Sequence, residues 1–275
     1  MILTSPDVAA TLEAAEAWHL RVQCETWRTL GAAHAHAVGI GGGVAAFTER
    51  LFGRKLNHVT GLGMDGPVDE DALARLEAAY AERGLATEID LCPHADARVP
   101  ALLARRGYAV NAFSNTYART LDGVSGRAPS GIEILQGDAA RALFVEASVD
   151  GFSLQAQQRP RELLEALARI ALARDDTSVF VARIDGRVAG SAGLSAMDTP
   201  RGRVGELHIA STLPAFRGRG VQAALLQARL AAARDAGCAL VFVGARPANT
   251  SARNVERAGF GLAFTKTTFA RPCHA

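Results

Sequence analysis

The segment of this sequence whose residue types best suit chemistry is HIASTLPAFRGRGVQAALL, residues 208–226. Gly218 and Gly220 let the backbone turn tightly, because neither carries a Cβ. The N–H groups of such a turn, together with the positive end of a helix that follows it, attract an anion. Arg217 and Arg219 add forked donors that suit phosphate. The sequence therefore predicts a phosphate-binding turn rather than an ordinary basic loop.

A second glycine-rich segment, GLGMDG at residues 61–66, has the G-x-G-x-x-G pattern that binds a dinucleotide pyrophosphate. Asp69 is expected to cap the helix that follows, with Glu70 and Asp71 in its first turn. Acids at this end suit the helix dipole, but they repel a pyrophosphate and compete for the same N–H groups. An NAD(P)-dependent oxidoreductase that uses this loop is therefore the alternative, and the RGRG turn is favoured.

Strands and helices must position both turns. The spacing of apolar residues predicts such elements before and after each turn. Ser5 and Pro6 are typical of a helix start, and Asp185-Gly186 is typical of a hairpin turn. The expected helices cover residues 6–30, 70–83, 99–106, 138–149, 161–174, 221–237 and 251–260. The expected strands cover residues 86–91, 132–135, 178–184, 187–197, 204–212, 238–245 and 262–271.

The composition limits the class of protein. A chain of 275 residues suggests two domains, at roughly 150 residues each. The net charge of +2 gives no electrostatic footprint for nucleic acid, and no apolar run reaches the ~18 residues of a membrane span. The start of the sequence lacks signal-peptide features, and the cysteines fall in no metal-ligand spacing. We therefore expect a reduced, cytoplasmic protein without a metal, a nucleic-acid partner or a membrane partner.

The two halves of the chain resemble each other. His58 falls against His208, Gly84 against Gly237, Gly107 against Gly259 and Arg119 against Arg271, at separations of 150 to 153 residues. A nearly constant separation of this kind indicates a duplicated unit. The boundary is expected in the Gly-, Ser- and Pro-rich residues 122–131, so that the predicted domains are 1–121 and 132–275.

Residues 132–271 resemble a GCN5-related N-acetyltransferase (GNAT) domain. Arg217, Gly220 and Gln222 stand at the places of the family's Q/R-x-x-G-x-G/A signature, with Gln222 replacing a small residue. The family's later motif, a polar turn before a helix that ends in Gly-Phe, matches NTSARNVERAGF. The resemblance implies an α+β (α/β) fold of two tandem GNAT-like domains, each a mixed, mostly antiparallel central sheet flanked by helices. The first half is then degenerate, because its turn lacks Arg and Gln.

The resemblance also implies that acetyl-CoA is the cosubstrate of an N-acetyltransferase. Its thioester would lie on the backbone of Ala210, Ser211 and Thr212, where one N–H polarises the carbonyl as an oxyanion hole does. The N–H groups of residues 218–223 would hold the pyrophosphate. The implied acetyl-CoA-binding residues are Ala210, Ser211, Thr212, Arg217, Gly218, Arg219, Gly220, Val221, Gln222, Ala223, Asn249, Ser251 and Asn254.

The catalytic residues follow from the same strand. An attacking amine must lose a proton, so a general base helps. Side chains alternate along a strand, which puts Glu206, His208 and Ala210 on one face and Ile209 and Ser211 on the other. Glu206 corresponds to the catalytic glutamate of GCN5-like members and is the expected base, with His208 as the alternative. The family often uses a tyrosine as the general acid that protonates the departing thiolate. At the corresponding place this chain has Val255.

The acceptor is expected to bind at residues 149–160, the region that shapes the acceptor pocket in this family. Phe152, Ser153 and Gln155 suggest a small amine of polar or mixed character. A protein N-terminus, lysine, polyamine, amino acid or antibiotic all remain open as the small-molecule or peptide acceptor. The protein is expected to be a monomer with an internal pseudo-dimer, or a homodimer. A non-catalytic acyl-CoA sensor is a further alternative.

Overall fold

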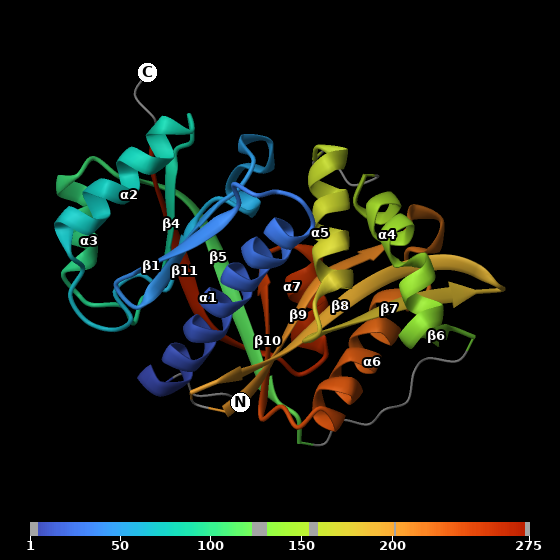
Figure 1. Cartoon of the computed structure of the whole chain (residues 1–275). Helices are drawn as coiled ribbons and strands as arrows, with labels where there is room; N and C mark the ends of the chain where they lie inside the picture. Colours follow the sequence, from blue (N-terminus) through green and yellow to red (C-terminus); the bar gives the residue numbers. More distant parts are fainter. Residues whose placement is uncertain (1–4, 123–130, 154–158, 201, 273–275) are drawn as a thin grey trace. The chain divides into compact units, whose positions relative to one another are not determined.

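The computed structural model describes residues 5–122, 131–153, 159–200 and 202–272. These residues form two compact units (Figure 1). The C-terminal unit contains the described residues of Ala118–Val243 and Thr250–Gly261. The N-terminal unit contains those of Ile2–Tyr117, Gly244–Asn249 and Leu262–Ala275.

The sheet of the N-terminal unit has the strand order β1-β2-β3-β4-β11-β5. The β1–β2, β2–β3 and β4–β11 pairs are antiparallel, and the β3–β4 pair is parallel. The elements of this unit are α1 (Pro6–Thr29), β1 (His36–Ile40), β2 (Gly43–Phe47), the 3-10 segment η1 (Arg50–Lys55), β3 (Val59–Thr60), α2 (Glu70–Glu82), β4 (Thr87–Leu91), α3 (Val99–Arg105), β5 (Ala109–Thr120) and β11 (Gly261–Arg271).

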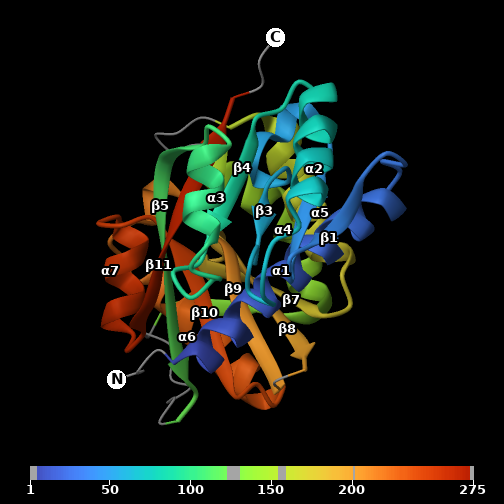
Figure 2. The same cartoon turned by 90° about the vertical axis from the view of Figure 1, so that its left-hand side faces the viewer.

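Helices cover both faces of this sheet (Figure 2). On one face, Leu20 and Cys24 of α1 pack against Ala46 of β2. On the other face, apolar residues of α2 and α3 pack against the flanking residues of β2, such as Phe47. Because successive side chains of β2 point to opposite faces of the sheet, this strand contributes to two cores, one on each side.

The sheet of the C-terminal unit has the strand order β10-β9-β8-β7-β6. The β6–β7, β7–β8 and β8–β9 pairs are antiparallel, and the β9–β10 pair is parallel. The elements are β6 (Glu133–Leu135), α4 (Gly137–Ser153), α5 (Arg161–Ala173), β7 (Thr177–Ile184), β8 (Arg187–Thr199), β9 (Gly202–Thr212), the 3-10 segment η2 (Pro214–Phe216), α6 (Val221–Asp235), β10 (Leu240–Ala245) and α7 (Thr250–Arg257).

The two units share one plan, as the sequence repeat predicts. In β1-β2-β3-β4 and in β7-β8-β9-β10, two antiparallel pairs are followed by one parallel pair. The parallel pair is joined by a helix in each unit, α2 or α6. Gly84 and Gly237 follow these helices with φ of 63° and 75°, values that favour glycine. The predicted fold of two similar mixed, mostly antiparallel sheets flanked by helices is confirmed.

The last strand of the chain and the last residues of β5 do not belong to the unit formed by most of their own half. β11 belongs to the N-terminal unit, where Thr267 pairs with Leu91 of β4. Arg119, at the end of β5, belongs to the C-terminal unit, where it donates to the carbonyl of Ala258 and its guanidinium lies over the Phe260 ring. This differs from the predicted division into 1–121 and 132–275, because pairing between distant strands leaves no local mark in a sequence. Of the predicted linker, residues 123–130 lie outside the described residues.

Two expectations from composition concern cysteines and membranes. Cys24, Cys92 and Cys238 are buried free thiols. Burial raises the pKa of Cys24 and of Cys92 to about 12, so both stay protonated. Within the described ranges, no helix is both long enough and apolar enough to cross a bilayer.

Candidate active site

The predicted thioester-binding stretch of β9 contains a β-bulge. Gly193 of β8 pairs with His208, but Ser191 pairs with Ser211, so β9 has one residue more than β8 in this interval. Ile209 takes up the extra length with a φ of 47°, which is unusual for a β-branched residue. The extra residue of a bulge is left out of the ladder. Backbone polar groups near Ile209 and Ala210 are therefore turned away from β8.

β9 also parts from its other neighbour at this point. Within the C-terminal unit the register of β9 with β10 runs from Val204↔Leu240 to Glu206↔Phe242. β9 itself continues to Thr212, well past the last of these pairs. Glu206 therefore stands where the two strands separate. Two neighbouring strands that part in this way leave room for an extended ligand arm between them.

The bulge corrects the predicted distribution of side chains on β9. A Cβ placed on Gly193 would lie 3.0 Å from both His208 Cε1 and Ile209 Cγ2, so these two side chains lie on one side of the sheet. Ser211 lies on that side as well, because its side chain packs against Gly151 of α4. The predicted placement of Ile209 and Ser211 opposite His208 is wrong, since strict alternation fails at an extra residue.

The predicted phosphate-binding turn leads directly into α6. Gly218 and Gly220 have φ of 74° and 83°, which explains why both are glycine. Among the described residues, no side chain caps the start of α6, and its first turn contains no acid. Val221, the first residue of α6, is buried in the core. A helix N-terminus without a side-chain cap suits an anion.

The cationic side chains around this turn are exposed. Arg217 and Arg219 are both at the surface. The Arg219 guanidinium lies 5.6 Å from the centre of the Phe216 ring, and that of Arg187 lies 5.4 Å from the same ring. Arg187 is a candidate phosphate contact that the sequence did not reveal. It follows the predicted hairpin turn Asp185-Gly186, whose φ values of 51° and 74° confirm that turn.

Gln222 and Ala223 occupy the first turn of α6. The Gln222 side chain is half-buried, and its Oε1 is 3.5 Å from the Thr212 hydroxyl. Ala223 is exposed. The large residue that departs from the family signature is thus directed toward the end of β9 rather than across the N–H groups.

The second predicted motif lies around α7. Asn249 stands immediately before this helix, and Ser251 and Asn254 lie on it, all three half-buried. Val255 is 5% exposed and belongs to the core. A valine has no ionisable proton, so this position supplies no general acid.

The predicted acceptor segment is described in part. Phe152 is half-buried and Ser153 is exposed, both at the end of α4. The Arg159 guanidinium lies 5.7 Å from the centre of the Phe152 ring. Gln155 lies outside the described residues.

His208 is held in a desolvated, cationic environment. Its Nε2 lies 2.9 Å from Ser195 Oγ. Burial lowers the pKa of His208 to about 3, with a further contribution from the charges of Arg174 and Arg229. The imidazole is therefore neutral at physiological pH and is a weak base. Glu206, half-buried opposite Ser195, is the stronger candidate of the two.

Sequence reasoning missed the polar side chains beneath His208. Ser195 and Thr177 are buried, and their hydroxyl oxygens are 2.7 Å apart. Arg174 and Asp176 form an ion pair at one end of this group. Nothing in the local sequence marks these residues, because three separate segments bring them together.

In and just after the GLGMDG segment, several backbone N–H groups already donate within the protein. Asp69 Oδ1 accepts hydrogen bonds from the N–H groups of Asp71, at 2.9 Å, and Ala72, at 3.3 Å. The Gly63 N–H donates to the carbonyl of Gly41 at 2.7 Å. The predicted cap at Asp69 is confirmed, and the N–H groups that a pyrophosphate needs are occupied.

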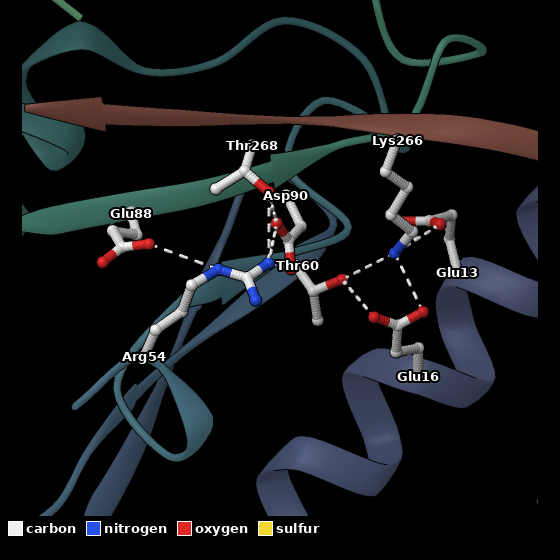
Figure 3. A network of polar contacts seen from close by, with 8 residues as sticks. All are labelled: Glu13, Glu16, Arg54, Thr60, Glu88, Asp90, Lys266 and Thr268. Carbon is white, nitrogen blue, oxygen red and sulfur yellow. Dashed lines mark hydrogen bonds and ion pairs between the residues drawn. The ribbon is translucent and has the colours of Figure 1, made fainter. Parts of the chain in front are cut away.

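A network of buried ions fills the interior of the N-terminal unit (Figure 3). Lys266 of β11 is 2% exposed, and its Nζ lies 2.7 Å from Glu13 Oε1 and 2.9 Å from Glu16 Oε2. Arg54 contacts both oxygens of Asp90, which also accepts from the Thr268 hydroxyl at 2.6 Å. Cations from η1 and β11 thus neutralise carboxylates from α1 and β4.

Three residues of this region could offer ligand atoms to a metal ion. One atom each from Glu16, His58 and Asp90 lie within 4.8 Å of one another. Lys266 and Arg54, however, already contact the two carboxylates. A cation would have to displace both side chains, so the arrangement favours a structural ion network over a metal centre.

Comparisons with known proteins concern the family and the fold. The profile of the acetyltransferase (GNAT) family matches residues 141–260. No curated protein matches the sequence significantly. Among solved structures, a GCN5-related N-acetyltransferase from Kribbella flavida is 18% identical with a TM-score of 0.64, over 96% of both chains.

Two further solved structures have the same fold. A tandem GNAT protein from the clavulanic acid biosynthesis pathway is 13% identical with a TM-score of 0.60, over 96% of both chains. A GCN5-related N-acetyltransferase from Sphaerobacter thermophilus is 15% identical with a TM-score of 0.57, over 88% of this chain and 76% of that chain. At these identities the likeness shows the fold, which includes both units.

Proposed function

Because residues 141–260 form a domain of the acetyltransferase (GNAT) family, we propose that this protein moves an acetyl group from acetyl-CoA to a primary amine. The amine attacks the thioester directly, in the C-terminal unit. The observation that carries this proposal is the bulge at Ile209, which turns backbone groups of β9 away from β8 where β9 also parts from β10.

The proposed position of acetyl-CoA follows from these features. The pantetheine arm lies along β9 from the bulge to Thr212, and the thioester carbonyl accepts from a backbone N–H of the bulge. The pyrophosphate lies at the start of α6, where no side chain of the described residues caps the helix. Positive charge around the pyrophosphate comes from Arg217, Arg219 and Arg187. The polar residues of the second motif, Asn249, Ser251 and Asn254, are the remaining proposed contacts with acetyl-CoA.

We assign the general base to Glu206. It stands where β9 and β10 separate, next to the place where the acetyl group would lie. A carboxylate there takes the proton that the amine loses, directly or through one water. His208, with its pKa lowered to about 3 by burial, is the weaker candidate at neutral pH. The leaving thiolate takes a proton from water, because Val255 has no proton to donate.

A panel of amines tests this assignment. Wild-type protein is incubated with acetyl-CoA and each acceptor class (peptide N-termini, lysine, polyamines, amino acids and aminoglycosides), and release of the CoA thiol is followed. Glu206→Gln should lower kcat by about 10²- to 10⁴-fold, with the Kd for CoA unchanged. The matched control is Glu162→Gln, which changes an exposed glutamate of α5 and should keep wild-type kcat.

Two outcomes would contradict the proposal. A thermal shift with NADH and none with acetyl-CoA would favour the oxidoreductase alternative. Tight binding of acetyl-CoA without thiol release for any amine would favour an acyl-CoA sensor. Wild-type kcat in Glu206→Gln would remove Glu206 from the reaction and leave the acetyl transfer itself in place.

A further inference from the structure

We propose that Asp176, Thr177 and Ser195 form a one-way chain of hydrogen bonds that fixes the tautomer of His208. In this tautomer Nε2 carries the proton and Nδ1 is the acceptor nitrogen of the ring. The three residues are positioning residues. The catalytic part of the inference rests on the proposed acetyl transfer, whereas the tautomer itself does not.

The chain is continuous and mostly buried. Thr177 Oγ1 lies 3.0 Å from Asp176 Oδ1 and 2.7 Å from Ser195 Oγ. Ser195 Oγ lies 2.9 Å from His208 Nε2. Ser195 is 0% exposed and Thr177 is 7% exposed, so water does not replace either hydroxyl.

One end of the chain can only accept. Arg174 donates through Nε to Asp176 Oδ1 at 2.8 Å and through Nη2 to Oδ2 at 2.7 Å. Burial alone would raise the pKa of Asp176, but the hydrogen bonds and charge of Arg174 outweigh it and hold that pKa below its usual value. An ionised carboxylate has no proton to donate.

This end fixes the direction of every other bond. A hydroxyl has one hydrogen, and that of Thr177 goes to Asp176. Ser195 must then donate to Thr177, which leaves Ser195 Oγ able only to accept from the ring. His208 therefore donates through Nε2. The bond made by one ring nitrogen decides which tautomer is present.

The tautomer gives His208 a role distinct from that of Glu206. His208 lies between Glu206 and the bulge at Ile209. A neutral ring with Nδ1 as acceptor can receive a hydrogen bond from an N–H of the amine and orient its lone pair toward the thioester, without taking a proton. His58, the counterpart in the N-terminal unit, has no such chain. Its Nδ1 is buried without a hydrogen-bond partner among the described residues.

Nitrogen NMR of the full-length protein tests the tautomer without an acceptor. Long-range ¹H–¹⁵N spectra distinguish a protonated ring nitrogen from an acceptor nitrogen, and the His208 signals are assigned by their loss in His208→Gln. We expect a protonated Nε2 and an acceptor Nδ1 in wild type. Thr177→Val cuts the chain and frees the Ser195 hydroxyl to donate to Nε2, which should shift both signals toward the opposite tautomer. Thr177→Ser restores the hydroxyl and should restore the wild-type spectrum.

Kinetics test the role. With an acceptor from the panel, Thr177→Val should lower kcat/KM for the amine at least fivefold, and Thr177→Ser should recover it. Thr199→Val removes a hydroxyl from the far end of β8 and should change neither spectrum nor kinetics, which controls for general loss of packing.

The proposal is overturned by a protonated Nδ1 in wild type, or by Thr177→Val behaving as wild type in both measurements. If the tautomer is as expected and no amine is acetylated, the proposed function fails and the tautomer assignment stands.

Discussion

After β3 the chain enters α2 through Asp69, whereas after β9 it enters α6 through Gly220. In the first case a carboxylate accepts from the helix N–H groups, and two more acids follow in the first turn. In the second case the N-cap is a glycine with φ of 83°, and arginines stand before it. The strand, turn and helix are the same in kind. The comparison teaches that the groups at one helix end decide whether its N–H groups are occupied by the protein or left for an anion.

The interiors of the two units differ in the same sense. The N-terminal unit neutralises buried carboxylates with Lys266 and Arg54. The C-terminal unit instead uses hydroxyls to connect His208 to a single ion pair. In the ion network each charged group is already paired with another charged group of the protein. In the hydroxyl chain the direction of each hydrogen bond fixes that of the next, up to the ring of His208. The first arrangement is a structural ion network, and the second is the arrangement that we propose to orient His208.

The largest effect is expected from removing the central cation of the N-terminal unit. Lys266→Met leaves Glu13 and Glu16 without their partner in a buried site, which costs about 3–5 kcal/mol of unfolding free energy. Urea denaturation measures this loss. Lys55→Met changes an exposed lysine of the same unit and is the control. Equal effects of the two changes would show that the network is not a structural centre.

A pair of glycines sharpens the comparison between the sheets. In β2 a Cβ on Gly43 would collide with the carbonyl oxygen of Thr60, and in β8 a Cβ on Gly190 would lie 2.5 Å from that of Ser211. Gly43→Ala and Gly190→Ala should each cost about 1–3 kcal/mol of unfolding free energy, because backbone must move. Only Gly190→Ala should also weaken CoA binding in calorimetry. Weakened binding in Gly43→Ala would contradict the assignment of the site to one unit.

The difference between the helix starts can be transferred by one substitution. Gln222→Asp places an acid in the first turn of α6, as Asp71 is placed in α2. CoA should bind at least tenfold more weakly than to Gln222→Asn, a loss of about 1.4 kcal/mol. The two variants have the same size and differ in charge, so calorimetry of the pair isolates repulsion of the phosphates. Equal affinities would place the pyrophosphate elsewhere.

The last effect concerns the pH dependence of stability. Burial lowers the pKa of His58 to about 4, so unfolding takes up a proton between about pH 6.5 and pH 4. Stability is then complete above pH 6.5 and falls as the pH decreases, by up to about 1.4 kcal/mol per pH unit. His58→Gln should flatten this decrease, as measured by urea denaturation at pH 7.5 and 5.

The titration of Glu13 changes stability with pH in the opposite direction to that of His58. Burial raises the pKa of Glu13 to about 7, opposed by the charge of Lys266, so its contribution to stability is lost as the pH rises from 4.5 to 7. Glu13→Gln should therefore steepen the decrease on the acidic side. A Glu13→Gln variant with a flatter dependence would contradict the sign.

The sequence could predict features that depend on interactions between neighbouring residues, but not features that depend on residues far apart in the chain. The cap at Asp69, the hairpin at Asp185-Gly186 and the glycines of the RGRG turn depend on a few neighbouring residues, and all three were predicted. The bulge at Ile209 was missed, because an extra residue is defined only against the partner strand. Lys266 gave no signal either, since its partner Glu16 is 250 residues away.

The position of β11 in the sheet of the N-terminal unit has a consequence for folding during synthesis. A ribosome releases residues of the first half long before it releases the last strand, and domains usually fold in that order. In this chain β4 must wait for β11, because Asp90 and Thr268 meet across 178 residues. The first unit to emerge is thus the one that cannot finish its sheet until β11 has been made, and until then its buried acids lack the lysine that neutralises them.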